Sequence, residues 1–224
     1  MKLDDWLPMY EAICREFGFS VESDRACAEL LSNLLGNKGA TSLENARKAI
    51  PQTVLLCGGS AELEQELASV GTSGFVVAAD GATSVLADAD IRVDMIVTDL
   101  DGIIEDQVEA SSRGAFVFLH AHGDNRLAVE KWTKKFLGPV IGTCQCPPPK
   151  GLYNFGGFTD GDRAACICAE LGVRTARLVG FDFDNPAEKR GKNGEVKKRK
   201  LRWAQTILDR LRADGVQLVS ALDE

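Results

Sequence analysis

Apolar positions along the chain follow two different periodicities, and the change falls near Pro51. Before it, apolar residues recur at the spacing of a helix that buries one face: Leu3, Trp6, Leu7, Tyr10, Ile13 and Phe17. Ser23 is expected to cap a second helix that runs to about Leu35, and Ser42 a third. The pattern therefore predicts a helical module over residues 1–50 that contains no strand.

From Thr53 onward, short apolar runs alternate with segments of helical periodicity. The runs are apolar throughout, which is typical of strands that are covered on both faces of a parallel sheet. They lie at residues 53–57, 75–79, 95–98, 115–119, 139–142, 176–179 and 216–219, with helices expected at 125–136 and 162–171. This rhythm predicts an α/β fold over residues 51–224, with a doubly wound, mainly parallel, Rossmann-like sheet and the first 50 residues as an N-terminal helical extension.

Two long breaks interrupt this rhythm, at residues 144–157 and 184–199. Loops of this length in a compact domain are usually functional or mobile. Residues 189–202 carry eight Lys or Arg and one Glu. This basic run is either a solvated helix face or a source of Lys and Arg side chains that close over phosphates.

Composition narrows the choice of partners. The 224 residues carry a formal net charge of −7, which gives no general attraction to nucleic acid. No apolar run approaches the roughly 20 residues of a membrane span, and the N-terminus has acidic residues and no apolar core. We expect a cytoplasmic protein without membrane or nucleic-acid partners, and a homodimer stays open.

The cysteines are scattered and odd in number, seven in all. In a cytosolic protein they are most simply buried thiols. Two Cys-x-Cys pairs suggest a metal site, at Cys144 with Cys146 and at Cys166 with Cys168. The second pair follows a helical pattern, in which positions i and i+2 point to different faces, so the buried-thiol interpretation is favoured.

Acidic residues recur where predicted strands end and helices begin. The residues are Asp80, Asp99 with Asp101, Asp124, and the pair Asp160 and Asp162. A parallel sheet brings its carboxyl ends to one edge, where ligands bind in open α/β folds. Carboxylates held together repel one another, and a divalent cation removes that cost. Oxygen ligands favour Mg²⁺, Mn²⁺ or Ca²⁺, and Mg²⁺ commonly joins one or two carboxylates to substrate phosphates.

The same residues allow two other interpretations, as helix caps or as zinc ligands. A single Asp at such a junction is more often a helix N-cap, but four junctions favour a site. His120-x-His122-x-Asp124 resembles the ligand spacing of dinuclear zinc hydrolases, yet the chain has only two His where such sites need more. Gly58-Gly59-Ser60 follows the first strand and is a candidate phosphate loop, although it fits neither the Walker nor the dinucleotide fingerprint.

Several segments together resemble the archaeal 6-hydroxymethyl-7,8-dihydropterin pyrophosphokinases, which are related in fold to thiamin pyrophosphokinases. The matching segments are 79–82 (ADGA), 94–102 (DMIVTDLDG), 120–125 (HAHGDN), 154–163 (NFGGFTDGDR) and 179–183 (VGFDF). The match runs in order from about Val54 to Leu218. Gly59 and Val93 stand where relatives often have Pro, which affects substrate detail more than reaction class.

The resemblance implies transfer of an intact diphosphoryl group from ATP to the pterin hydroxymethyl group, with release of AMP, for tetrahydromethanopterin or folate synthesis. It implies Mg²⁺ held by Asp80, Asp99, Asp101 and Asp124. Catalytic roles are expected for Asp101, Asp124 and Asp160, and one of these acidic residues would accept the hydroxyl proton. Nucleotide-binding roles are expected for Gly58, Gly59, Ser60, Asp80, Gly81, His122, Asn125, Asp162 and Arg163.

Three alternatives stay open at this point. Thiamin pyrophosphokinase shares the chemistry, but it carries an all-β domain after the α/β domain, and here we expect none after the last strand at 216–219. A nucleotide-sugar-dependent glycosyl-transfer accessory protein would also suit the Asp-x-Asp pair. A non-catalytic nucleotide or metal sensor could keep the glycine loops while losing the carboxylates, whereas this chain has them all.

Overall fold

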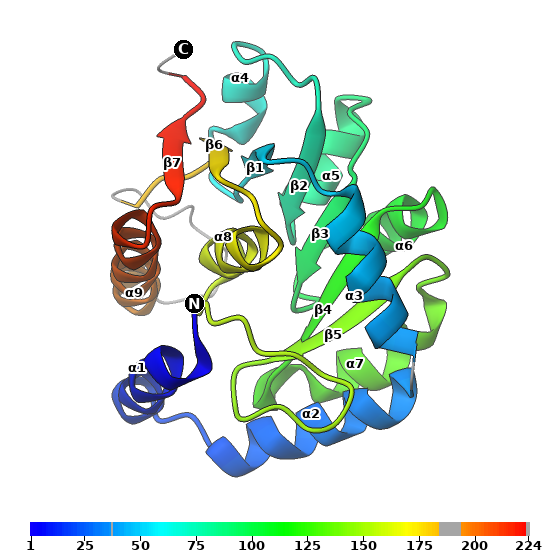
Figure 1. Ribbon diagram of the computed structural model, residues 1–224, viewed down its shortest axis with the longest axis vertical. Coiled ribbons are helices and arrows are strands. Elements are labelled where there is room, and N and C mark those ends of the chain that lie inside the picture. Colours follow the sequence, from blue (N-terminus) through cyan, green and yellow to red (C-terminus); the bar gives the residue numbers. More distant parts are fainter. Residues whose placement is uncertain (37, 184–193, 223–224) are drawn as a thin grey trace.

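Seven parallel strands form one sheet in the computed structural model, which describes residues 1–36, 38–183 and 194–222 (Figure 1). The strand order is β5-β4-β3-β2-β1-β6-β7, so the predicted doubly wound parallel fold is confirmed. The strands are β1 (Thr53–Cys57), β2 (Phe75–Ala79), β3 (Met95–Thr98), β4 (Phe116–Ala121), β5 (Val140–Cys144), β6 (Thr175–Val179) and β7 (Gln217–Ser220).

The strands β4 and β5 extend two residues beyond the predicted runs at their carboxyl ends. The apolar pattern does not predict this extension, because a pair of polar residues continues the β4–β5 ladder. His120 and Thr143 are partners in register, and the His120 Nδ1 lies 3.0 Å from the Thr143 hydroxyl. At the other end, Pro139 offers only its carbonyl, which accepts from the Val117 N–H, and β5 begins at Val140.

The helices cover both faces of the sheet, and across the described ranges none combines the length and apolarity of a membrane span. Those after the first strand are α4 (Leu63–Leu67), α5 (Ala82–Asp88), α6 (Ile104–Ser112), α7 (Arg126–Trp132), α8 (Asp160–Glu170) and α9 (Gly194–Ala213), with 3₁₀ turns η1 (Gly123–Asn125) and η2 (Thr133–Lys135). The helix predicted at 125–136 is thus divided into α7 and η2. The helix predicted at 162–171 begins earlier, at Asp160, because Thr159 and Asp162 form a capping box there.

The direction of the connections fixes the position of the ligand crevice. From β1 to β5 each strand is added on the same side, so right-handed crossovers place α4 to α7 on one face. The chain then returns through α8, which lies across the front of the sheet in Figure 1, to β6 on the other side of β1. The strand order therefore reverses between β1 and β6, the point where such folds bind ligands.

Three helices precede the sheet, as predicted: α1 (Leu3–Phe17), α2 (Val21–Leu35) and α3 (Lys38–Ala49). The predicted caps are wrong. Ser20 caps α2 by accepting from the Ser23 N–H at 3.1 Å, and Ser42 lies inside α3. The helices α2 and α3 pack on β5, and buried side chains of all three join the core of the sheet. The domain boundary at residue 50 stays a prediction.

One buried carboxylate, that of Asp24, joins the N-terminal helices to the edge of the sheet. Asp24 is 2% exposed and accepts three hydrogen bonds of 2.7 Å each. The donors are the Tyr10 hydroxyl of α1, the Gln145 amide that follows β5, and the Gly123 N–H of η1. Asp24 therefore fixes α1 and α2 against the loop that follows β4.

We expect Asp24→Asn to lower the free energy of unfolding by about 3 kcal/mol, because one acceptor oxygen becomes an amide donor that faces other donors. Denaturant unfolding followed by circular dichroism measures the change. The matched control is Glu29→Gln, at an exposed position of the same helix, which should stay within about 0.5 kcal/mol. Equal unfolding midpoints for the two variants would contradict the role of Asp24.

Candidate active site

Three carboxylates from separate elements meet at the carboxyl edge of the sheet. Asp80 follows β2, Asp99 follows β3, and Asp160 opens α8. One oxygen from each lies within 4.8 Å of the others, and all three are buried or half-buried. Oδ1 of Asp99 is buried and has no hydrogen-bond partner among the described residues. This all-oxygen arrangement fits a divalent cation of the hard class.

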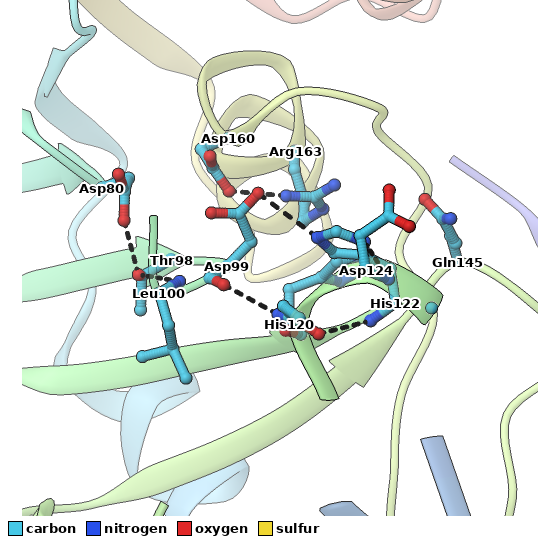
Figure 2. A network of polar contacts seen from close by, with 12 residues as sticks. Asp80, Thr98, Asp99, Leu100, His120, His122, Asp124, Gln145, Asp160 and Arg163 are labelled. Atoms are coloured by element: carbon cyan, nitrogen blue, oxygen red, sulfur yellow. Dashed lines mark hydrogen bonds and ion pairs between the residues drawn. The ribbon is translucent and has the colours of Figure 1, made fainter. Parts of the chain in front are cut away.

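Hydrogen bonds from two neighbouring side chains hold the Asp80 carboxylate in place. Its Oδ1 accepts from the Thr98 hydroxyl at 2.7 Å (Figure 2). The same oxygen accepts from the Gln107 amide at 3.0 Å. Asp80 has a φ of 43°, a conformation that is rare outside Gly and is concentrated at functional sites. A Cβ on Gly102 would approach the Asp80 Oδ2 to 2.9 Å, so a side chain at this position would displace the Asp80 carboxylate.

Asp99 is paired with His122 across the site. The two side chains lie 3.5 Å apart, between His122 Nε2 and Asp99 Oδ2. Because His122 Nδ1 accepts from the Asp124 N–H, Nε2 carries the proton and donates to the carboxylate. Burial raises the pKa of Asp99, but the His122 hydrogen bond and the charge of Arg163 outweigh it and leave the pKa lowered. Asp99 is therefore ionised and ready to bind a cation.

Asp160 is the member of the cluster whose ionised form is disfavoured by its surroundings. Burial raises its pKa well above the usual range, the negative charges of Asp99 and Asp80 add to the effect, and Arg163 opposes it. The Arg163 guanidinium donates to Asp160 Oδ1 at 2.6 Å and to the Phe158 carbonyl at 2.8 Å. Repulsion among the carboxylates is thus only partly relieved by protein groups, which favours a bound cation.

Two residues predicted to bind the ligand also have structural partners, and their binding roles stay predictions. The Asp162 carboxylate, 1% exposed, accepts from the Phe158 and Thr159 N–H groups and caps α8. The Asn125 amide donates to the carbonyls of Asp99 and His120 at 2.7 Å each, and its oxygen accepts from the His122 N–H. These contacts shape the loops that carry Asp99 and His122, so both residues support the site.

Other predicted residues lie around the cluster rather than in it. Asp101 and Asp124 are exposed and lie outside the group of three carboxylates. Figure 2 shows Asp124 on the Gln145 side of Asp99, and Asp80 on the opposite side. Gly81 directly follows Asp80 and caps α5. Asp160 was predicted as a catalytic residue, and the structure also brings it into the candidate metal set.

The loop Gly58-Gly59-Ser60 lies at the reversal of strand order. The Gly58 N–H donates to Val179, and the Ser60 N–H to Gly180, so the ends of β1 and β6 are joined. A Cβ on Gly58 would approach the Gly180 carbonyl to 2.4 Å. This loop opens into a cavity that we call the glycine-loop cavity, lined by Gly58, Gly59, Ser60, Gly161, Phe181 and Lys197.

A second cavity lies on the other side of Asp99. Its volume is about 260 Å³, and we call it the Phe19 cavity. Its walls come from the turn between α1 and α2, the first turn of α2, the loops after β3, β4 and β5, the start of α8 and one Lys of α9. The lining residues include Phe19, Ser23, Asp99, Asp124, Gln145, Phe158 and Lys200. Residues 189–193 of the basic run lie outside the described residues, while Lys197 and Lys200 each line one of the two cavities.

The cysteines take no part in the cluster. All seven are buried and free, which confirms the buried-thiol interpretation. Burial raises the pKa of Cys57 and Cys168 to about 12, so these thiols stay protonated. Within the described part of the chain, the residues placed to share a metal are carboxylates, and no cysteine belongs to such a group.

Sequence reasoning missed several residues that shape the site. Thr98 and Gln107 hold Asp80, and Asp24 and Gln145 line the Phe19 cavity. Of these, Thr98 lies in a motif quoted above, and its position before Asp99 could have suggested its role. Asp24 and Gln145 lie far along the chain from Asp80 and Asp99, and Gln107 lies inside α6, outside the quoted motifs. Only the packing of the elements brings them to the site.

The chain is similar to known pterin enzymes over nearly its whole length. A family model described as 6-hydroxymethylpterin diphosphokinase MptE-like matches residues 28–188. A Pyrococcus furiosus protein named 6-hydroxymethyl-7,8-dihydropterin pyrophosphokinase is 42% identical, and the match covers 96% of each chain. A Methanothermobacter thermautotrophicus protein of the same name is 35% identical over 96% of this chain and 97% of that one.

Among solved structures there is a weaker likeness, of fold alone. The MAf glycosyltransferase from Magnetospirillum magneticum AMB-1 matches with a TM-score of 0.44 and 14% identity. The match covers 69% of this chain and 30% of that chain.

Variants of the acidic residues should separate cluster members from their neighbours. Asp99→Asn should weaken Mn²⁺ binding by at least about 100-fold, because it removes a charged ligand from the group of three. Asp124→Asn should change the affinity by less than about 3-fold, since Asp124 lies outside that group. Electron paramagnetic resonance of free Mn²⁺ measures both. Equal losses in the two variants would place Asp124 among the ligands.

The raised pKa of Asp160 predicts the direction of the pH dependence. A proton on Asp160 competes with the cation, so the affinity for Mn²⁺ should fall as the pH is lowered from about 8 to about 5. Asp160→Asn, which has no proton to release, should bind more weakly and with a flatter pH profile. Calorimetry at each pH measures the affinity. An affinity of the wild-type protein that is independent of pH would contradict the competition.

Proposed function

The chain belongs to the MptE-like 6-hydroxymethylpterin diphosphokinase family, and from this we propose that it transfers a diphosphoryl group from ATP to 6-hydroxymethyl-7,8-dihydropterin. The observation that carries the proposal is the cluster of Asp80, Asp99 and Asp160 at the carboxyl edge of the sheet. Phosphoryl-type transfer depends on positioning and charge neutralisation, and this cluster is suited to both. Thiamin, the first alternative, is disfavoured by the names of the relatives.

In the proposed reaction one phosphorus–oxygen bond replaces another. The pterin hydroxymethyl oxygen bonds to the β-phosphorus of ATP, and the bond from that phosphorus to the α,β-bridging oxygen breaks. AMP leaves with the bridging oxygen, and the hydroxyl proton goes to a base. Mg²⁺, when bound by the cluster, would neutralise charge on the phosphates. The product is the pterin diphosphate, an intermediate suited to tetrahydromethanopterin or folate synthesis.

We place the nucleotide at the glycine-loop cavity. This cavity lies where the strand order reverses between β1 and β6, the usual ligand crevice of open α/β folds. The start of α8 also lines it, and helix N-termini favour phosphate. Ser60 Oγ is buried there, and no described residue bonds to it, which suits a ligand that supplies a partner. Lys197 of α9 lines the same cavity and carries the charge that phosphates attract.

The protein's own groups have separate tasks in this scheme. His122 and Arg163 orient Asp99 and Asp160 through the contacts described above. We assign the proton-accepting role to Asp124, because it lines the cavity beside Asp99 yet lies outside the metal cluster. A carboxylate that is engaged with a cation is a weaker base, so an acidic residue next to the cluster is better suited to this step.

The test is AMP release from ATP and Mg²⁺ with 6-hydroxymethyl-7,8-dihydropterin, and with thiamin in parallel. We expect AMP with the pterin alone. Asp99→Asn should abolish turnover together with metal binding. Asp124→Asn should keep metal binding and lower kcat about 100-fold, as expected for loss of a general base.

Leu127→Ala is the matched surface control, because Leu127 on α7 is 81% exposed, and it should behave as the wild type. AMP formed with thiamin alone would overturn the substrate, and no AMP with either would overturn the reaction. A full rate in Asp124→Asn would remove Asp124 from the mechanism and leave the reaction intact.

A further inference from the structure

The proposed function leaves one side of the acidic cluster without an occupant, and the Phe19 cavity lies there. The glycine-loop cavity is bounded by the ends of β1 and β6, whereas the Phe19 cavity includes Gln145 after β5 and His122 after β4. Asp99 lines the Phe19 cavity and is also a member of the cluster. A ligand in the Phe19 cavity would therefore reach the cluster from the side opposite to the nucleotide.

An apolar wall of aromatic rings forms one side of this cavity. The rings of Phe19 and Phe158 have centroids 6.3 Å apart, and Phe17 lies behind both, at 5.5 Å from Phe19 and 5.4 Å from Phe158. Phe158 is 8% exposed, while Phe19, in the turn between α1 and α2, is half-buried and can offer a ring face to a ligand. Such a wall suits a flat heteroaromatic ring system.

Polar groups line the rest of the cavity. Gln145 is 7% exposed, and its amide is fixed by a 2.7 Å bond to Asp24, so the base of the cavity is pre-organised. Ser23 and Asp124 lie on its exposed side. A pterin has hydrogen-bond donors and acceptors around the edge of an apolar ring face. A mostly apolar site with a few placed polar groups is the usual form of a small-molecule pocket.

One cation lies beside the aromatic wall. The Lys200 ammonium, carried by α9, is 5.7 Å from the Phe19 ring centroid and 5.5 Å from that of Phe158. The neighbouring Arg199 lies over the Phe17 ring, 4.7 Å from its centroid, and is paired with Glu16 at 2.8 Å. The Lys200 side chain thus lies between the body of α9 and the turn that joins α1 to α2. This place is at the edge of the space where the acceptor would gain its diphosphate.

We propose that the Phe19 cavity is the acceptor site, in which the pterin ring packs on Phe19 and its hydroxymethyl group points to Asp99. This assignment rests on the proposed function. It gives the N-terminal helices a role in substrate binding, since the turn between α1 and α2 supplies Phe19 and the first turn of α2 supplies Ser23. In-line transfer requires that acceptor and leaving group lie on opposite sides of the phosphorus, as the two cavities allow.

The experiment measures the KM values for pterin and for ATP in the full-length protein and three variants. Phe19→Ala removes the ring and should raise the pterin KM about 10-fold, the size of one lost stacking contact. Phe19→Leu keeps apolar volume without a flat face and should give an intermediate value. Ser23→Trp fills the cavity from an exposed position and should raise the pterin KM at least as much. The ATP KM should change less than about 2-fold in all three.

Binding of 6-hydroxymethylpterin, followed by its fluorescence in the absence of ATP, gives a second readout, and thermal unfolding checks that each variant is folded. A raised ATP KM with an unchanged pterin KM would show that the nucleotide occupies this cavity. Wild-type values for both substrates in Phe19→Ala and Ser23→Trp would overturn the assignment while the reaction stands. Absence of pterin turnover in the wild type would instead overturn the proposed function itself.

Discussion

Electrostatic repulsion among three carboxylates is the constraint on which the site depends. Asp80, Asp99 and Asp160 each place an oxygen within 4.8 Å of the others. Repulsion between the ionised carboxylates costs free energy, and this cost rises as the groups are buried. Protein groups compensate for part of it: Thr98 and Gln107 donate to Asp80, and His122 and Arg163 serve the other two. The raised pKa of Asp160 shows that a cost remains. In the proposed function, a divalent cation and the substrate phosphates would compensate for the remaining cost.

The fold supplies this arrangement through simple connections. Parallel strands present Asp80 and Asp99 at neighbouring ends, and α8 returns across the sheet with Asp160 in its first turn. The reversal of strand order opens the glycine-loop cavity on one side of the cluster. On the other side the sheet alone offers no wall, and the turn between α1 and α2 provides one. Asp24 holds that turn in place through three hydrogen bonds.

Much of the fold and part of the site could be predicted because the responsible signals are local in sequence. Continuous apolar runs identified the strands, and the position of an acid just after a run identified Asp80 and Asp99 as neighbours. The same rule did not separate cluster members from residues nearby. Asp101 lies in the same loop as Asp99, and Asp124 lies after β4, yet both are outside the group of three carboxylates, while Asp162 and Asn125 bond to backbone groups. The periodicity also missed the last residues of β4 and β5, where His120 bonds to Thr143.

By itself the sequence determined the α/β class, the helical start, the acidic edge and the family resemblance, because each is encoded in residues that are close along the chain. The tertiary structure alone decided which carboxylates share an ion, which polar residues support them, and that the cavity beside Asp99 is lined by Phe19 and Gln145. Some of those contacts join residues more than a hundred positions apart, such as Asp24 and Gln145. They depend on side-chain direction and helix packing, and no local pattern in the sequence specifies either.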